Sequence, residues 1–147
     1  MYLILYVILA VALMTDLKED RIPNLLILTG LVTGVVMLIL SDADWIEVLF
    51  QTMIVFFCLI PVYMIGALGG GDIKLLVLFP IFIGLELSIN AIISSFMAAA
   101  ICSVIKAVAL LAAKKEIPIR KLTIHFSVPI LIGTVLTVSG GLQWITI

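Results

Sequence analysis

Residues 69–74 read Gly-Gly-Gly-Asp-Ile-Lys, and they interrupt two apolar runs, residues 45–67 and 75–84. Three consecutive glycines carry no side chains, so the backbone can bend there or let another chain approach closely. Asp72 follows them at the edge of a membrane-like segment, where ionisable groups are costly and usually functional. We therefore expect Asp72 to be a site residue. Room for a substrate backbone beside it would come from Gly69, Gly70 and Gly71.

The composition is that of an integral membrane protein. Of the 147 residues, 65% are hydrophobic and only 12% are charged, and the mean hydropathy is +1.42. Soluble domains carry roughly 25% charged residues. The net charge of −1 argues against a nucleic-acid partner. The two cysteines, Cys58 and Cys102, lie in separate apolar segments without a CxxC spacing, which argues against a disulfide or metal framework.

Apolar segments divide the chain into six parts. A helix that crosses a bilayer takes about 20 residues, so the length allows six crossings with short loops. We predict an all-α polytopic membrane protein with six transmembrane helices and one membrane-embedded domain over residues 1–147. Kinks are expected at Pro61, Pro80 and Pro129, which lie within segments. The segments are approximately residues 2–15, 23–40, 45–67, 73–84, 87–113 and 126–142.

The charges of the loops predict the orientation. Every Lys and Arg falls in or beside the loops after the first, third and fifth segments, whereas the charged residues of the opposite loops are all acidic. By the positive-inside rule the basic side is cytoplasmic, so both termini should face outward. The basic residues are Lys18, Arg21, Lys74, Lys106, Lys114, Lys115, Arg120 and Lys121. The acids opposite are Asp42, Asp44, Glu47 and Glu86.

This topology brings Asp16, at the end of the first apolar run, to the same face as Asp72. Two carboxylates held close together do not both ionise easily, so one becomes an acid and the other a base near neutral pH. Such a pair can activate water for attack on a peptide carbonyl and protonate the leaving amine. We expect no cofactor and no metal for this chemistry. The one histidine, His125, makes a weak ligand set with two carboxylates.

Other interpretations stay open at this point. Asp20 lies one helical turn after Asp16, and spacing alone allows either to be the partner, although burial favours Asp16. Lys74 either snorkels to lipid headgroups or tunes the pKa of Asp72. The two aspartates could instead be a relay in a small ion- or proton-coupled transporter. A subunit that only packs against a partner protein is the third alternative.

The glycines and Asp72 fit the GxGD motif of intramembrane-type aspartic proteases. Asp16, followed by Ile22, Pro23 and Asn24, resembles the other half of the type IV prepilin peptidase signature. This resemblance implies that Asp16 and Asp72 are the catalytic dyad, with Ile22, Pro23, Asn24 and Lys74 in support. Presenilin-like and signal-peptide-peptidase-like enzymes share GxGD, but their Pro-Ala-Leu motif is not found here.

The resemblance also implies a substrate and a partner. Members of this family cut type IV pilin-like precursors on the cytoplasmic side of the membrane, between a short basic leader and an apolar helix. The chain starts directly at its first apolar segment, so it is similar to the short CpaA/TadV-like forms of Flp/Tad pilus systems, without the N-terminal methyltransferase region. The lipid bilayer is the other expected partner. The oligomeric state, the cleavage preference and the assignment of acid and base are left open.

Overall fold

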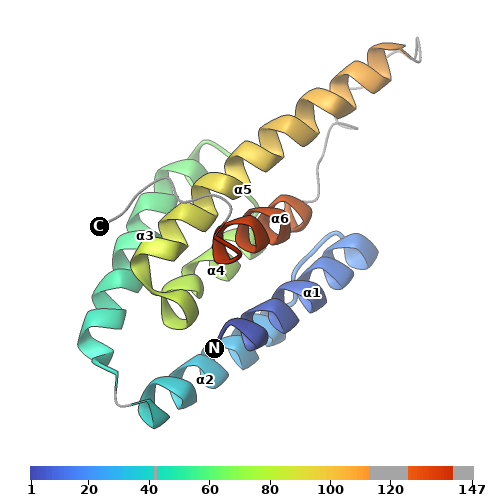
Figure 1. Cartoon of the computed structure of the whole chain (residues 1–147). Helices are drawn as coiled ribbons and strands as arrows, with labels where there is room; N and C mark the ends of the chain where they lie inside the picture. The colour runs from blue at the N-terminus through green and yellow to red at the C-terminus, as the bar shows by residue number, and fades with distance from the viewer. Residues whose placement is uncertain (42, 113–125, 141–147) are drawn as a thin grey trace.

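The computed structural model describes residues 1–41, 43–112 and 126–140, and folds them into six helices without a strand among those residues (Figure 1). Several residues discussed above lie outside this described part, namely Asp42, Lys114, Lys115, Arg120, Lys121 and His125. The predicted all-α architecture is therefore confirmed for the described residues. The helices are α1 (Tyr2–Glu19), α2 (Asn24–Leu40), α3 (Trp45–Met64), α4 (Gly70–Val77), α5 (Phe79–Ala112) and α6 (Ser127–Val138).

Two of these helices are long and apolar enough to cross a membrane, α3 and the stretch Phe79–Ala109 of α5. α2 and α6 are apolar but shorter, so six crossings stay a prediction. Large apolar side chains nevertheless cover the outside of the bundle; Leu25 and Ile39 of α2 are 70% and 72% exposed. Exposed apolar surface of this extent is costly in water and is typical of contact with lipid or protein.

Local chemistry explains where the first three helices begin and end. Asp20 takes a left-handed conformation (φ 53°) and its N–H donates to the carbonyl of Asp16, which closes α1. Pro23 is extended and directly precedes α2. Proline suits the start of a helix because the N–H groups there have no helical partner, so its missing N–H leaves no bond unmade. The Asp44 carboxylate accepts hydrogen bonds from the N–H groups of Ile46 and Glu47, an N-cap that starts α3.

The fourth predicted segment, residues 73–84, is two helical pieces. Pro80 cannot donate to the carbonyl four residues earlier, so α4 stops before it and α5 begins at Phe79. Gly84 then interrupts α5 with φ 74° and ψ 173°, a conformation that residues with a side chain rarely adopt. The sharp bend of α5 is therefore at a glycine.

The prediction of proline kinks holds for Pro80, where the predicted segment 73–84 is interrupted, and is wrong for Pro129. Pro80 and Pro129 lie in the first turns of α5 and α6, where a missing N–H leaves no helical hydrogen bond unmade. Pro61 does lie inside a helix, in the last turn of α3. Proline in an apolar segment can begin a helix as well as bend one, and the sequence does not distinguish the two.

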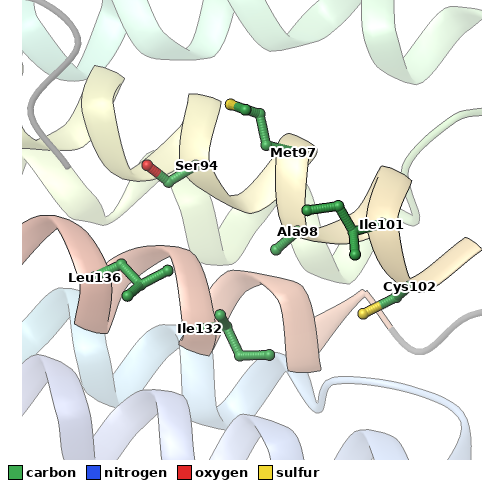
Figure 2. A pocket seen from close by; sticks show the side chains of 7 residues that line it. All are labelled: Ser94, Met97, Ala98, Ile101, Cys102, Ile132 and Leu136. Carbon is green, nitrogen blue, oxygen red and sulfur yellow. The ribbon is translucent and has the colours of Figure 1, made fainter. Parts of the chain in front are cut away.

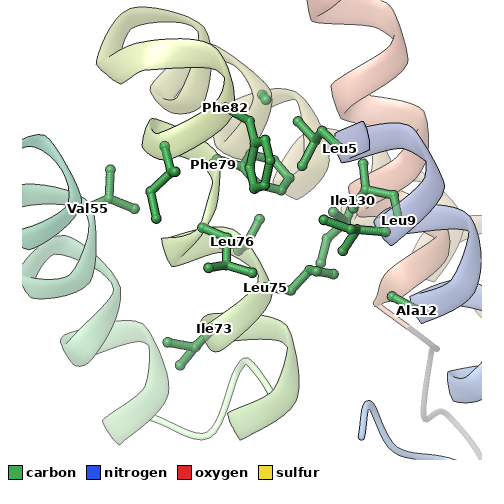
Figure 3. Packing of buried hydrophobic residues seen from close by; sticks show 14 of the residues in the cluster. Leu5, Leu9, Ala12, Val55, Ile73, Leu75, Leu76, Phe79, Phe82 and Ile130 are labelled. Carbon is green, nitrogen blue, oxygen red and sulfur yellow. The ribbon is translucent and has the colours of Figure 1, made fainter. Parts of the chain in front are cut away.

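The short helix α4 supplies the centre of the core. Leu75 and Leu76 of α4 and Phe79 of α5 are fully buried. Figure 3 shows Leu5 and Leu9 of α1 and Ile130 of α6 on one side of them, and Val55 of α3 on the other. Burying one such side chain contributes roughly 1.5–3 kcal/mol. The position of α4 is therefore determined by four other elements at once.

Glycines allow the closest helix contacts. A Cβ on Gly30 would come within 3.1 Å of Leu78 Cδ1, and one on Gly34 within 2.5 Å of Ile81 Cγ2. The GxxxG pair of α2 therefore packs against the junction of α4 and α5. A Cβ on Gly133 of α6 would collide with the backbone nitrogen of Ser95 in α5. Small residues at helix contacts are typical of membrane bundles.

Gly133→Ala should destabilise the protein more than Gly34→Ala. The new methyl meets backbone in the first variant, whereas in the second it meets the Cγ2 methyl of Ile81, a side-chain atom that can shift by a rotation about χ1. Overpacking of this kind costs about 1–3 kcal/mol. Thermal unfolding of the two purified variants in one detergent measures the difference, and equal losses would contradict the described contact between α5 and α6.

Candidate active site

Asp16 is a buried acid at the end of α1. It lies in the last turn of the helix and is 9% exposed. The hydroxyl of Ser127, the first residue of α6, donates to Asp16 Oδ2 at 2.6 Å. Asp20, the alternative partner that spacing left open, is exposed at the C-terminal cap of the helix. The structure thus distinguishes the two acids by burial.

Asp72 is the third residue of α4 and is half-buried. Its carboxylate accepts a hydrogen bond from the backbone N–H of Gly69, the residue that caps the helix. A carboxylate at this position of a helix often bonds back to the cap in this way, and the helix dipole favours its negative charge. The side chain is therefore held by its own helix.

The two carboxylates influence each other electrostatically. Burial raises the pKa of Asp72, the charge of Asp16 raises it further, and the Gly69 N–H partly offsets both; the result is about 6, against an ordinary 3.8. Asp72 lies before the apolar part of its segment, outside the spanning helices. A pair that shares one proton near neutral pH can supply an acid and a base together.

The three glycines before Asp72 differ in what surrounds them. A Cβ on Gly71 would lie 3.1 Å from Ile22 Cβ, so the space left by its missing side chain is filled by the α1–α2 loop. A Cβ on Gly69 would lie 3.0 Å from Asp72 Oδ2. One on Gly70 would meet only Tyr63 Cε2, at 3.9 Å, which is ordinary contact. Two glycines are thus required by packing, and Gly70 alone has room for a side chain.

The residues around Ile22 make a second link to α4. Lys74 Nζ donates to Asn24 Oδ1 at 2.9 Å, joining α4 to the first residue of α2. The sequence alone did not predict that Lys74 bonds to Asn24. Pro23 places Asn24 by ending the loop in an extended conformation. The two motif halves are far apart in the chain, but they contact each other beside the carboxylates, through Ile22 on Gly71 and Asn24 on Lys74.

An apolar groove runs between α3 and α4 next to this site. Its volume is about 250 Å³, and it opens beside Gly70, the one glycine of the three with room for a side chain. Lys74 is the one charged residue on its wall. The lining residues are Phe56, Ile60, Tyr63, Gly70, Ile73 and Lys74.

A second cavity, between α5 and α6, has different chemistry. Its volume is about 320 Å³, and Figure 2 shows Ser94 among side chains that are otherwise apolar or sulfur-bearing. Neither Asp16 nor Asp72 lines it. It is therefore not part of the site. In the described part of the chain, no group of three or more His, Cys, Asp or Glu side chains is placed to hold a metal ion.

Sequence reasoning missed Ser127. It stands at the start of the last apolar segment, and nothing in its neighbours marks it as a partner of Asp16. A polar residue at the same predicted membrane edge as both aspartates was the available signal.

Comparison with known proteins gives one match. The model of the type IV leader peptidase family matches residues 3–104, which include both aspartates and the glycines. No curated protein and no solved structure matches the chain.

Gly71→Ala should lower thermal stability, and Gly70→Ala should leave it nearly unchanged. The added methyl at residue 71 meets the branched carbon of Ile22, which cannot turn away, whereas the methyl at residue 70 has room. We expect a loss of about 1–3 kcal/mol for the first variant. Thermal unfolding of both variants checks this, and similar stabilities would show that Ile22 does not pack on Gly71.

Asp72→Asn should stabilise the protein above about pH 6 and have no such effect below about pH 4. The folded state holds the Asp72 proton up to a pKa of about 6, whereas the unfolded chain loses it near 3.8. Stability of the wild type therefore falls relative to Asn as pH rises between these values. Melting temperatures across this range measure the difference.

The same substitution in an Asp16→Asn background is the control. The stabilisation should shrink there, because the repulsion by Asp16 is already removed while burial remains. A difference that does not change with pH, or does not change with the background, would contradict the coupling of the two carboxylates.

Proposed function

The chain belongs to the type IV leader peptidase family, and we propose that it is a membrane aspartic endopeptidase acting through an Asp16/Asp72 dyad. Family membership implies a peptidase with a precursor protein as substrate. The proposed substrates are type IV prepilin-like precursors of the Flp/Tad type. The whole chain, residues 1–147, would be one membrane-embedded domain with six crossings, both termini outside and the dyad at the cytoplasmic face.

The observation that carries this proposal is the electrostatic coupling of two carboxylates from separate helices. Asp16 is buried in α1, and the pKa of Asp72 in α4 is raised toward neutrality, first by burial of Asp72 and then by the charge of Asp16. A relay across a membrane would need polar groups at successive depths, whereas Asp16 and Asp72 each lie in an end turn of their helix, at the same predicted membrane face. The arrangement supports hydrolysis better than transport.

The reaction needs one proton on the pair. The ionised carboxylate takes a proton from water, whose oxygen attacks the scissile carbonyl carbon, while the protonated carboxyl gives its proton to the carbonyl oxygen. The resulting diol collapses when the first carboxyl protonates the amide nitrogen and the C–N bond breaks. A hydroxyl proton of the diol returns to the other carboxylate, which restores the starting state.

The groove between α3 and α4 suits the apolar segment of the precursor. It opens beside Gly70, within one helical turn of Asp72, and its wall carries the aromatic side chains Phe56 and Tyr63. A peptide bond that lies just before an apolar helix would then reach the dyad when the helix lies in the groove. Gly70 leaves room for the extended backbone at this point.

Asp16→Asn and Asp72→Asn should each lower kcat for cleavage of a pilin-type precursor by about a hundredfold to ten-thousandfold, because each removes one member of the acid–base pair. The assay uses purified protein in detergent with a precursor carrying its leader and apolar helix. Asp20→Asn is the matched control, since Asp20 is an exposed acid of the same helix end. It should keep activity within about threefold.

Retained cleavage in both Asp16→Asn and Asp72→Asn would refute the dyad. An Asp72-dependent ion flux in proteoliposomes, together with no cleavage by the wild type, would favour a transporter instead.

A further inference from the structure

Ser127 contributes a buried hydroxyl to the site from the far end of the chain. It is 2% exposed, and its Oγ donates to Asp16 Oδ2 at 2.6 Å. It lies beyond residues 3–104, the part that the family model matches. The contact joins the first residue of α6 to the last turn of α1, two helices that pack directly against each other.

The environments of the two carboxylates are therefore unequal. Asp16 receives a hydroxyl hydrogen bond, a short charge-assisted contact that favours an ionised acceptor. The N-terminus of α6 adds its positive dipole end beside the same group. Asp72 accepts the Gly69 N–H and lies in the first turn of its own helix, but its burial and the charge of Asp16 outweigh these influences and raise its pKa.

We propose that Ser127 is a positioning residue that orients Asp16 and holds it in the ionised form, so that Asp16 is the base and Asp72 the acid. This assignment rests on the proposed function and adds to it. Asp16 then accepts the proton from the attacking water and later passes it to the amide nitrogen. Asp72 gives its proton to the carbonyl oxygen and recovers one from the diol.

The remaining titratable groups around Asp16 come from α1 itself, its loop and the helices packed against it. α2 and the described part of α6 contain no titratable side chain, so neither adds a charge. α4 contributes Asp72 and also Lys74, which bonds to Asn24. α5 carries Glu86, Cys102 and Lys106, and α1 itself carries the tyrosines Tyr2 and Tyr6 and the exposed Lys18 and Glu19. The exposed Asp20 caps α1, and the exposed Arg21 follows it in the loop to α2. His125 is outside the described residues.

The test compares Ser127→Ala and Ser127→Thr with a matched control, Ser95→Ala. Ser95 is another fully buried serine, whose hydroxyl donates to the carbonyl of Ala91 and not to a carboxylate. The measurement is kcat and KM for precursor cleavage over a range of pH, with melting temperatures for each variant. Ser127→Thr keeps the hydroxyl, whereas the two alanine variants each lose one.

We expect Ser127→Ala to lower kcat by about tenfold to a hundredfold with KM nearly unchanged, since a misplaced catalytic group can cost this much. The acidic limb of its kcat/KM profile should move to higher pH, because the pair loses the hydrogen bond that favours its ionised member. Ser127→Thr should restore most of the rate and the wild-type limb. Ser95→Ala should change stability alone.

Two results would overturn the assignment while leaving the proposed peptidase function intact. One is a Ser127→Ala enzyme with wild-type kcat and pH profile. The other is an equal loss of kcat in Ser127→Ala and Ser95→Ala without a moved limb, which would show a purely structural role. A wild type that cleaves no precursor would refute the function itself. The wild type is therefore assayed before any variant.

Infrared spectroscopy tests the proton assignment without activity and without a Ser127 variant. At about pH 5 the wild type should show a protonated carboxyl band that disappears in Asp72→Asn and persists in Asp16→Asn. The reverse pattern would overturn the assignment even if Ser127→Ala failed to fold.

Discussion

The mutual repulsion of Asp16 and Asp72 is the constraint on which the arrangement depends. Two acids in a partly buried place oppose each other, and burial alone already raises the pKa of Asp72. The fold offsets this cost with hydrogen bonds to both, from Ser127 to Asp16 and from the Gly69 N–H to Asp72. The pair retains one proton as a result, and in the proposed reaction this proton is given to the scissile carbonyl.

Holding the pair together takes packing as well as hydrogen bonds. Leu75 and Leu76 bury α4 between its neighbours, so the helix that carries Asp72 has little freedom to withdraw. Ile22 packs on the bare backbone of Gly71, and Lys74 bonds to Asn24, so the loop after α1 lies against the start of α4. The glycines of the GxGD pattern thus have a packing role in this chain. The two glycines that it specifies are crowded, and the residue between them is not.

Much of the fold and part of the site could be predicted from residue patterns. Apolar runs predicted helices because a buried or lipid-facing backbone must satisfy its own hydrogen bonds. The predicted boundary at residue 84 coincides with the left-handed Gly84 that breaks α5. The prolines were harder, since a predicted segment divides into two helices at Pro80, whereas Pro129 lies in the first turn of a single helix. Whether a proline begins or bends a helix depends on where the preceding element stops, and that is set by tertiary packing.

The sequence by itself determined the helical class, the apolar character and the two candidate aspartates, because these follow from composition and from the positions of charged residues beside apolar runs. It left Asp16 and Asp20 hard to separate and did not indicate Ser127 at all. Only the tertiary structure decided that Asp16 is buried, that Ser127 bonds to it, and that the charge of Asp16 reaches Asp72. Burial and electrostatic coupling depend on distances between helices that are remote in the chain, and no local pattern encodes those distances.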